Sequence, residues 1–364
     1  MTSIPMLDLA RLHAPVADEM KRVFAQTLES SRFIGGPAVE RFEEQLAERV
    51  GTPGAIGVSS GTDALIVALM GLGVKPGDDV ITSPYTFFAT AGSIARLGAR
   101  PVFVDIEPDT FNINPALIED AITERTVGII PVHLFGQCAE MEPILELAKA
   151  RGLWVLEDAA QAIGAKYHGR AAGTMGVATA FSFFPAKNLG ALGDAGAAVT
   201  NDTDLGDRLK ALRQHGAVRK YFHETVGGNF RLDALQAALL SVKLPLLSSW
   251  EQGRRRVADR YRALLGSHPE VMLPIEREGN FHVFNQYVIR TPRRDALKQT
   301  LVEAGIGCAV YYPKCLHLQE CFSSLGHRRG DFVEAERAAK ETLAIPVDPN
   351  LGDEAIEQIA KTII

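Results

Sequence analysis

Long apolar runs, CxxC pairs and an excess of basic residues are all missing from this sequence. No stretch of about 18 consecutive apolar residues occurs, so we expect no membrane-spanning helix. Residues 1–15, MTSIPMLDLARLHAP, lack a basic segment followed by an apolar one, and we therefore expect no secretory leader. The formal net charge of −6 argues against nucleic acid as the main partner, because binding its phosphates needs a broad basic face.

The cysteines and the basic clusters point to no special chemistry. The spacing of the cysteines does not suit a disulfide framework, which predicts reduced thiols in the cytoplasm; they are Cys138, Cys308, Cys315 and Cys321. The stretch CLHLQEC (315–321) lacks the paired ligands of a structural zinc site, so we expect no metal centre there. The run Arg254–Arg256 lies in a helical pattern, and we expect it on a solvated helix face.

The pattern of apolar residues predicts two domains. Between about residue 54 and residue 200, apolar strands alternate with helical segments, and the strands are continuously apolar rather than alternating. Such strands belong to a sheet that is covered on both faces, and the βαβ order predicts a doubly wound, mostly parallel α/β sheet. The alternation fades after a long helix over residues 231–252. We therefore predict a large domain over residues 1–244, including N-terminal helices, and a smaller α+β domain over residues 245–364.

Polar residues follow several of these strands, where an open α/β sheet binds its ligands. The turn SSGTDAL (59–65) offers Gly61 and Thr62 at a helix start, which suits an anion. It also fits a plain helix start capped by Ser60 or Asp63. Asp158 ends a fully apolar strand, with Gln161 three residues later. A carboxylate there is costly unless it meets a cation, although Asp158 can equally cap the following turn.

Two further strand ends carry aromatic rings and an amine. In SPYTFFAT (83–90), the two phenylalanines suit a core, or one of them can offer its flat face to a ligand ring. In AFSFFPAKNLGALGDAG (180–196), Ser182 and Lys187 lie between an apolar strand and a glycine-rich loop. Lys187 either reaches the surface or has chemistry to perform. Taken together, an amine, an acid, a phosphate cradle and a stacking aromatic ring are what pyridoxal 5′-phosphate (PLP) enzymes need.

The chain resembles the DegT/DnrJ/EryC1/StrS family of nucleotide-sugar aminotransferases almost from end to end. The family comprises fold type I PLP enzymes of the aspartate aminotransferase superfamily. The resemblance is carried by FIGGPAVERFEEQLAERVG, SSGTDAL, PYTFFAT, PVHLFGQ, EDAAQ, SFFPAKNLGALGDAG, GGNFRLDALQAA and YYPKCLHLQ. It implies the α/β fold above and a role for each matching residue.

The resemblance implies that Lys187 forms the Schiff base with PLP and that Asp158 meets the pyridine nitrogen. It implies further cofactor contacts for Gly61, Thr62 and Ser182 at the phosphate, Phe87 stacked on the ring and Gln161 at the ring hydroxyl. From the neighbouring subunit of a homodimer, Asn229 would reach the phosphate. Arg231 would face the acidic donor or the sugar, and Tyr311 and Tyr312 would line the substrate side.

The implied reaction moves an amino group from L-glutamate to a keto group on a nucleotide-linked sugar, for amino-sugar and polysaccharide biosynthesis. The segments RKYFHETVGGNFRLD and YYPKCLHLQECF resemble relatives that aminate C3 rather than C4, on UDP or dTDP sugars. Two alternatives are a PLP-dependent sugar dehydratase and a non-catalytic regulatory protein of the same fold. The dehydratase would carry histidine in place of Lys187, and the regulatory protein would have lost Lys187, Asp158 or Gln161.

Overall fold

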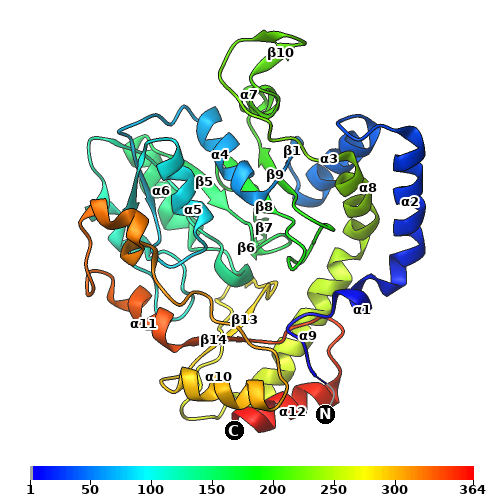
Figure 1. The fold of residues 1–364 in the computed structure, drawn as a ribbon. Helices are drawn as coiled ribbons and strands as arrows, with labels where there is room; N and C mark the ends of the chain where they lie inside the picture. Colours follow the sequence, from blue (N-terminus) through cyan, green and yellow to red (C-terminus); the bar gives the residue numbers. More distant parts are fainter. Residues whose placement is uncertain (1–2) are drawn as a thin grey trace.

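A computed structural model describes residues 3–364, and its centre is a sheet of seven strands (Figure 1). The strand order is β1-β9-β8-β5-β4-β2-β3. Only β9 runs antiparallel to its neighbours in this sheet. The strands are β1 (Gly54–Val58), β2 (Asp79–Thr82), β3 (Arg100–Phe103), β4 (Thr126–Ile129), β5 (Trp154–Asp158), β8 (Ala178–Ser182) and β9 (Gly196–Thr200). The predicted doubly wound, mostly parallel α/β sheet is confirmed.

Helices cover both faces of this sheet. One hydrophobic cluster contains residues of α3 (Pro37–Val50), α6 (Met141–Arg151) and α8 (Ala234–Lys243). The other contains residues of α4 (Gly61–Gly71), α5 (Ala89–Arg96) and α7 (Thr203–Arg213). Successive strand residues point to opposite faces, and Val155 packs in the first cluster while Leu156 packs in the second. This double coverage explains the continuously apolar strands.

The C-terminal part has its own hydrophobic cluster. It gathers α9 (Leu247–Leu265), α10 (Arg294–Glu303), α12 (Asp353–Ile363) and the antiparallel pair β13 (Tyr287–Arg290) and β14 (Thr342–Ile345). The single long helix predicted over residues 231–252 is wrong: α8 ends at Lys243, and α9 begins at Leu247 after one 3₁₀ turn that contains Pro245. Helix α9 runs from the sheet to this group (Figure 1). Ile4 also packs there and pairs with Ile306. The predicted division between residues 244 and 245 stays a prediction.

The remaining elements lie around these two cores. Helices α1 (Leu9–His13) and α2 (Ala17–Ser30) precede α3, and α11 (Val333–Glu341) precedes β14. A small sheet joins β6 (Lys166–Tyr167), β7 (Arg170–Ala171) and β12 (Asn280–Phe281). The hairpin of β10 (Ala217–Arg219) and β11 (Phe222–His223) projects beyond α7 (Figure 1). Within the described residues, no helix combines the length and the apolar character needed to cross a membrane.

The structure corrects the expectation for the arginine run. Arg254 is buried, and its Nη1 donates to the carbonyls of Phe284 and Asn285 at 3.1 and 3.3 Å and to that of Val347 at 3.3 Å. Burial lowers the pKa of Arg254 to about 10, although Asp348 opposes the shift. The helical pattern placed this residue on α9 correctly, but it could not show that the loops before β13 and after β14 would cover that face. Arg256 of the same run is exposed, as expected.

Candidate active site

The strand ends that carry the predicted site residues meet at one edge of the central sheet. Strands β5 and β8 are parallel neighbours, with Asp158 opposite Ala180. Their carboxyl ends carry Asp158 and Ser182 and lead to Gln161 and Lys187. The carboxyl ends of β1 and β2 lead to Gly61 and Phe87 at the same edge. Tertiary structure therefore brings together groups that are separated by up to about 130 residues of sequence.

Lys187 is half-buried in the loop after β8. Its backbone N–H donates to the carbonyl of Phe184 at 2.8 Å, which forms a tight turn. Burial lowers the pKa of Lys187 to about 8, and the nearby charge of Asp158 opposes the shift. Burial also lowers the pKa of Lys243 to about 8, but that side chain is completely buried. Of these two lysines, Lys187 is half-buried and Lys243 is completely buried.

Asp158 is buried and hydrogen-bonded. One carboxylate oxygen accepts from Thr90 Oγ1 at 2.7 Å, and the other accepts from the backbone N–H of Ala160 at 3.2 Å. Burial raises the pKa of Asp158, although these two bonds and the charge of Lys187 oppose the rise. The side chain therefore caps the turn, as one reading of the sequence held, and it acts electrostatically on Lys187 as well. Sequence reasoning did not identify Thr90, a hydroxyl in the first turn of α5.

Gln161 links the sheet to a distant aromatic segment. Its Oε1 accepts from the backbone N–H of Phe135 at 2.7 Å, and its Nε2 donates to Tyr312 Oη at 3.0 Å. The ring of Tyr312 lies 6.2 Å from the ring of Phe87, centroid to centroid. Tyr85 supports this segment, because its hydroxyl bonds the carbonyl of Tyr311 and lies 2.7 Å from Thr342 Oγ1. Tyr312 is therefore placed beside Gln161 and Phe87.

The phenylalanine pair is not core. Phe87 is 58% exposed and Phe88 is 46% exposed. Phe88 stacks on Phe322 with ring centroids 5.6 Å apart. Phe87 therefore keeps an accessible ring at the end of β2, which is the alternative that suits a ligand.

The start of α4 forms a narrow cradle against Ser182. Ser60 is the N-cap, and its Oγ accepts from the N–H of Asp63 at 3.1 Å. Gly61 and Thr62 supply the first N–H groups of the helix, which have no partners within it. A Cβ on Gly61 would lie 2.6 Å from the Cβ of Ser182, so only glycine permits this approach. The capped helix start suggested by the sequence is confirmed, and the binding of an anion by Gly61 and Thr62 stays a prediction.

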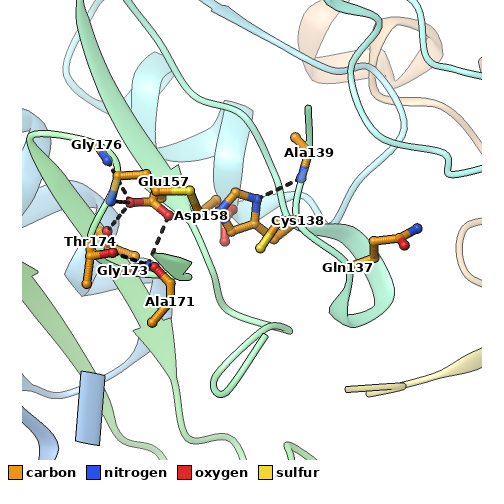
Figure 2. Close-up of polar contacts among 12 residues, drawn as sticks. Gln137, Cys138, Ala139, Glu157, Asp158, Ala171, Gly173, Thr174 and Gly176 are labelled. Atoms are coloured by element: carbon orange, nitrogen blue, oxygen red, sulfur yellow. Dashed lines mark hydrogen bonds and ion pairs between the residues drawn. The ribbon is translucent and has the colours of Figure 1, made fainter. Parts of the chain in front are cut away.

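A buried polar network supports Asp158 from the adjacent residue. Glu157 Oε1 accepts from the backbone N–H groups of Met175 and Gly176 at 2.8 and 2.7 Å and from Thr179 Oγ1 at 3.1 Å. Glu157 Oε2 accepts from the Gly173 N–H at 3.0 Å and lies 2.9 Å from His133 Nε2 (Figure 2).

The hydrogen-bond donors around Glu157 determine its pKa and the tautomer of His133. Burial by itself would raise the pKa of Glu157, but the hydrogen bond with His133 and the N–H groups of Gly173 and Gly176 hold it below its ordinary value. His133 Nδ1 accepts from the Ala139 N–H at 3.1 Å (Figure 2). The proton of a neutral imidazole therefore sits on Nε2, which donates to Glu157.

Asn229 and Arg231 lie in a segment that runs beside the end of β1. The N–H of Ser59 donates to the carbonyl of Phe230 at 3.0 Å, and Val58 pairs with Arg231. Asn229 is exposed, and the Arg231 Nε is buried without a partner among residues 3–364. Within this chain neither side chain bonds the other predicted site residues.

Comparisons with known proteins agree with this fold. The model of the DegT/DnrJ/EryC1/StrS aminotransferase family matches residues 16–364. A pleiotropic regulatory protein of Geobacillus stearothermophilus is 50% identical over 99% of this chain and 98% of its own. A UDP-N-acetyl-3-dehydro-alpha-D-glucosamine 3-aminotransferase of Acidithiobacillus ferrooxidans is 42% identical over 100% and 97%. The crystal structure of S. venezuelae DesV with a ketimine intermediate has a TM-score of 0.97 at 40% identity and covers 100% and 98% of the two chains.

We expect Glu157→Gln to lower the free energy of unfolding by about 3 kcal/mol at pH 7, because an amide nitrogen would face donors that the carboxylate now satisfies. The folded pKa of Glu157 lies below its ordinary value of 4.5. Its contribution is therefore complete above that value and is lost as the pH falls through the folded pKa. Urea denaturation of both proteins at fixed protein concentration, from pH 7 to pH 3, measures the difference.

Glu48→Gln is the matched control, because Glu48 is exposed on α3. It should change the free energy of unfolding by no more than about 0.5 kcal/mol. Equal stability of the two variants, or a deficit of Glu157→Gln that does not shrink in acid, would contradict this account of the network.

Proposed function

Because the chain belongs to the DegT/DnrJ/EryC1/StrS aminotransferase family, we propose that it transfers the amino group of L-glutamate to the keto carbon of a nucleotide-linked sugar. The cofactor would be PLP. The observation that carries this proposal is the amine of Lys187, whose pKa is lowered by burial and which interacts electrostatically with the buried carboxylate of Asp158. A transaminase needs such an amine to hold the cofactor and to move a proton.

The residues present fit PLP. The start of α4 and Ser182 suit its phosphate, because N–H groups and a hydroxyl converge where Gly61 leaves room. Asp158 offers a buried carboxylate for the ring nitrogen, and Phe87 offers an exposed ring for stacking. Gln161 Nε2 already donates to a phenol, that of Tyr312, so it suits a ring hydroxyl. When bound, the cofactor supplies an electron sink for the carbon next to the reacting amine.

The shifted pKa of Lys187 serves this role. With a pKa of about 8, the side chain is neutral in about a quarter of molecules at pH 7.5, against about a thousandth for an ordinary lysine. A neutral amine can hold an aldehyde and can take the proton from Cα of the amino donor. Asp158 stabilises a positive partner, because its carboxylate is buried and its remaining hydrogen bonds are satisfied.

A regulatory role has one observation in its favour, the name of the Geobacillus relative. A protein that only senses a ligand has no need for an amine of lowered pKa that interacts with a buried acid. Lys187, Asp158 and Gln161 are all present, and the first two are electrostatically coupled. These residues support catalysis, and they argue against the dehydratase as well, because its lysine position would hold histidine.

The cell compartment and the pathway are part of the proposal. All four cysteines are free in the structure, which supports work in the reducing cytoplasm. The Acidithiobacillus relative is named for amination of a UDP-linked sugar. We therefore place this chain in amino-sugar biosynthesis, with a nucleotide-linked ketosugar as its acceptor.

We also propose a homodimer with shared active sites. Val218 and Tyr221 in the β10–β11 hairpin are 64% and 80% exposed, and Val226, just after the hairpin, is 88% exposed. The hairpin projects from the rest of the protein (Figure 1). Apolar side chains that are so exposed are typical of a surface that contacts another protein chain. The same segment continues to Asn229, whose side chain is exposed and suits the phosphate of a neighbouring site.

Borohydride reduction of the cofactor-loaded protein, followed by peptide mapping, should attach the cofactor to Lys187. Lys187→Ala should still bind PLP through the phosphate contacts, but its kcat with glutamate should fall about a thousandfold or more, because the amine holds the cofactor and carries the proton. Exposed Lys340→Ala is the control and should behave as wild type. Label on Lys243 would overturn the assignment, and a loaded protein that exchanges no amino group with glutamate would favour regulation.

Mixing Lys187→Ala subunits with Asn229→Ala subunits should restore activity if Asn229 acts across the dimer. After random exchange, half of the dimers are mixed and each has one intact site, so about a quarter of wild-type activity should return. Lys187→Ala mixed with Asp158→Ala is the control and should stay inactive, because these two residues serve the same site within one chain. If subunit exchange is demonstrated and the first mixture stays inactive, Asn229 does not act across the dimer.

We expect amination at C3 of a UDP or dTDP sugar, such as a 2-acetamido-3-keto hexuronate or a 3-keto-6-deoxyhexose. Tyr312 lies beside Phe87, and Tyr311, Tyr221 and His223 are further donors for sugar hydroxyls. A buried polar group left unpaired costs about 1–3 kcal/mol, so we expect about a 10- to 100-fold preference in kcat/KM over the 4-keto isomer. Competition between 3-keto and 4-keto sugars, with the new C–N bond located by NMR, measures it. Preferred amination at C4 would contradict this expectation and leave the PLP chemistry intact.

A further inference from the structure

Lys243 is a completely buried lysine to which the proposed reaction assigns no role. It is the last residue of α8, and its side chain is 0% exposed. Among residues 3–364 it forms no ion pair with a carboxylate, although a buried ammonium usually requires one. The chain therefore keeps an amine in its core with polar partners of another kind.

Those partners come from two segments far apart in the sequence. Lys243 Nζ donates to the backbone carbonyl of Gly190 and lies 2.8 Å from His13 Nε2, on α1. It also lies 5.9 Å from the centre of the Trp250 ring. Burial lowers its pKa to about 8. Both the ammonium and the neutral amine have enough N–H groups to donate to Gly190 and His13 at once.

Gly190 belongs to the loop that carries Lys187, and this loop closes tightly on itself. The N–H of Ala191 donates to the carbonyl of Phe183 at 2.7 Å, and the N–H of Lys187 donates to that of Phe184 at 2.8 Å. A Cβ on Gly190 would lie 2.2 Å from the carbonyl oxygen of Pro185, so the two ends of the turn are in contact. Any shift of the Gly190 peptide is therefore passed on to Lys187.

A second side chain of the same helix holds this loop. Gln236 Nε2 donates to the carbonyl of Leu192 at 3.1 Å, and Gln236 Oε1 accepts from the Leu192 N–H at 2.9 Å. Gln236 and Lys243 are seven residues apart, two helical turns, and lie on one face of α8. Side chains of α8 are thus hydrogen-bonded to the loop at Gly190 and at Leu192.

We propose that Lys243 is a positioning residue for the transamination. The hydrogen bonds from Lys243 and Gln236 to the loop after β8, which we call the clasp, fix the position of the Lys187 amine. The inference rests on the proposed function only for its effect on catalysis, because the clasp itself is a property of the folded chain. The rival role is that Lys243 only attaches α1 to the core through His13. The two roles predict opposite behaviour of variants at His13.

Three variants separate these roles: Lys243→Met, which keeps the bulk of the side chain but has no donor, Gln236→Leu and His13→Gln. Each is made in the full-length protein. The first measurement is hydrogen exchange of residues 184–196 after removal of the cofactor. The second is kcat and KM for glutamate in the loaded enzyme, and thermal unfolding reports stability.

Lys243→Met should speed exchange of the loop by about tenfold or more, because the Gly190 carbonyl loses its donor. Its kcat should fall about tenfold or more, because the Lys187 amine is displaced from its reacting geometry. KM for glutamate should change by no more than about threefold. Gln236→Leu should act in the same direction with a smaller effect. His13→Gln should lower thermal stability but leave loop exchange and kcat within about twofold of wild type.

Wild-type loop exchange and kcat in a folded Lys243→Met protein would overturn the proposal. So would a His13→Gln protein that reproduces both effects, since Lys243 would then act through α1. If Lys243→Met does not fold, Gln236→Leu decides, and unchanged loop exchange in that variant overturns the clasp. A wild-type enzyme without turnover would count against the proposed function, while loop exchange would still test the clasp.

Discussion

Burial of the Lys187 amine near the Asp158 carboxylate is the constraint on which the rest of the site depends. Desolvation lowers the pKa of the amine, and the acid opposes that shift without cancelling it. The same desolvation raises the pKa of Asp158, which Thr90 and the turn after β5 oppose. The site therefore holds a readily deprotonated amine and a carboxylate with satisfied hydrogen bonds at the edge of one sheet.

Holding two such groups in place requires a rigid surrounding, and the fold supplies it from both sides. Behind β5, Glu157 gathers backbone N–H groups of the loop between β7 and β8 and faces His133. Behind the loop after β8, α8 contributes Lys243 and Gln236. These buried polar side chains bond mostly to backbone groups. A hydrogen bond within the protein replaces one with water, so each adds little to the net free energy of folding. The main effect of these side chains is therefore to fix the conformations of the loops.

The aromatic segment around Tyr312 gives the site its second wall. Tyr312 reaches Gln161 and approaches Phe87, while Tyr85 holds the neighbouring carbonyl. This wall comes from the C-terminal part of the chain, whereas the amine, the acid and the cradle come from the central sheet. Substitutions in this wall can therefore occur without changing the groups that we propose to hold the cofactor.

The sequence by itself determined the alternation of strands and helices over the central sheet and the residues that end its strands, but not the break in the expected helix over residues 231–252. Continuous apolar strands, helical periodicity and polar strand ends are local patterns, and local patterns suffice to place Gly61, Phe87, Asp158, Gln161 and Lys187 at one edge of a sheet. The resemblance to a family added the cofactor and the reaction. Burial was not accessible in this way: Phe87 and Phe88 are exposed, whereas Arg254 is buried.

Only the tertiary structure decided which distant groups meet. Thr90 on Asp158, Tyr312 on Gln161 and Lys243 on Gly190 join segments about 50 to 150 residues apart. None of these pairs has a signature in spacing, because each depends on how helices and loops pack over the sheet. The same packing sets desolvation, and desolvation sets the pKa of Lys187. A sequence can thus name the amine, but the packed fold sets its pKa.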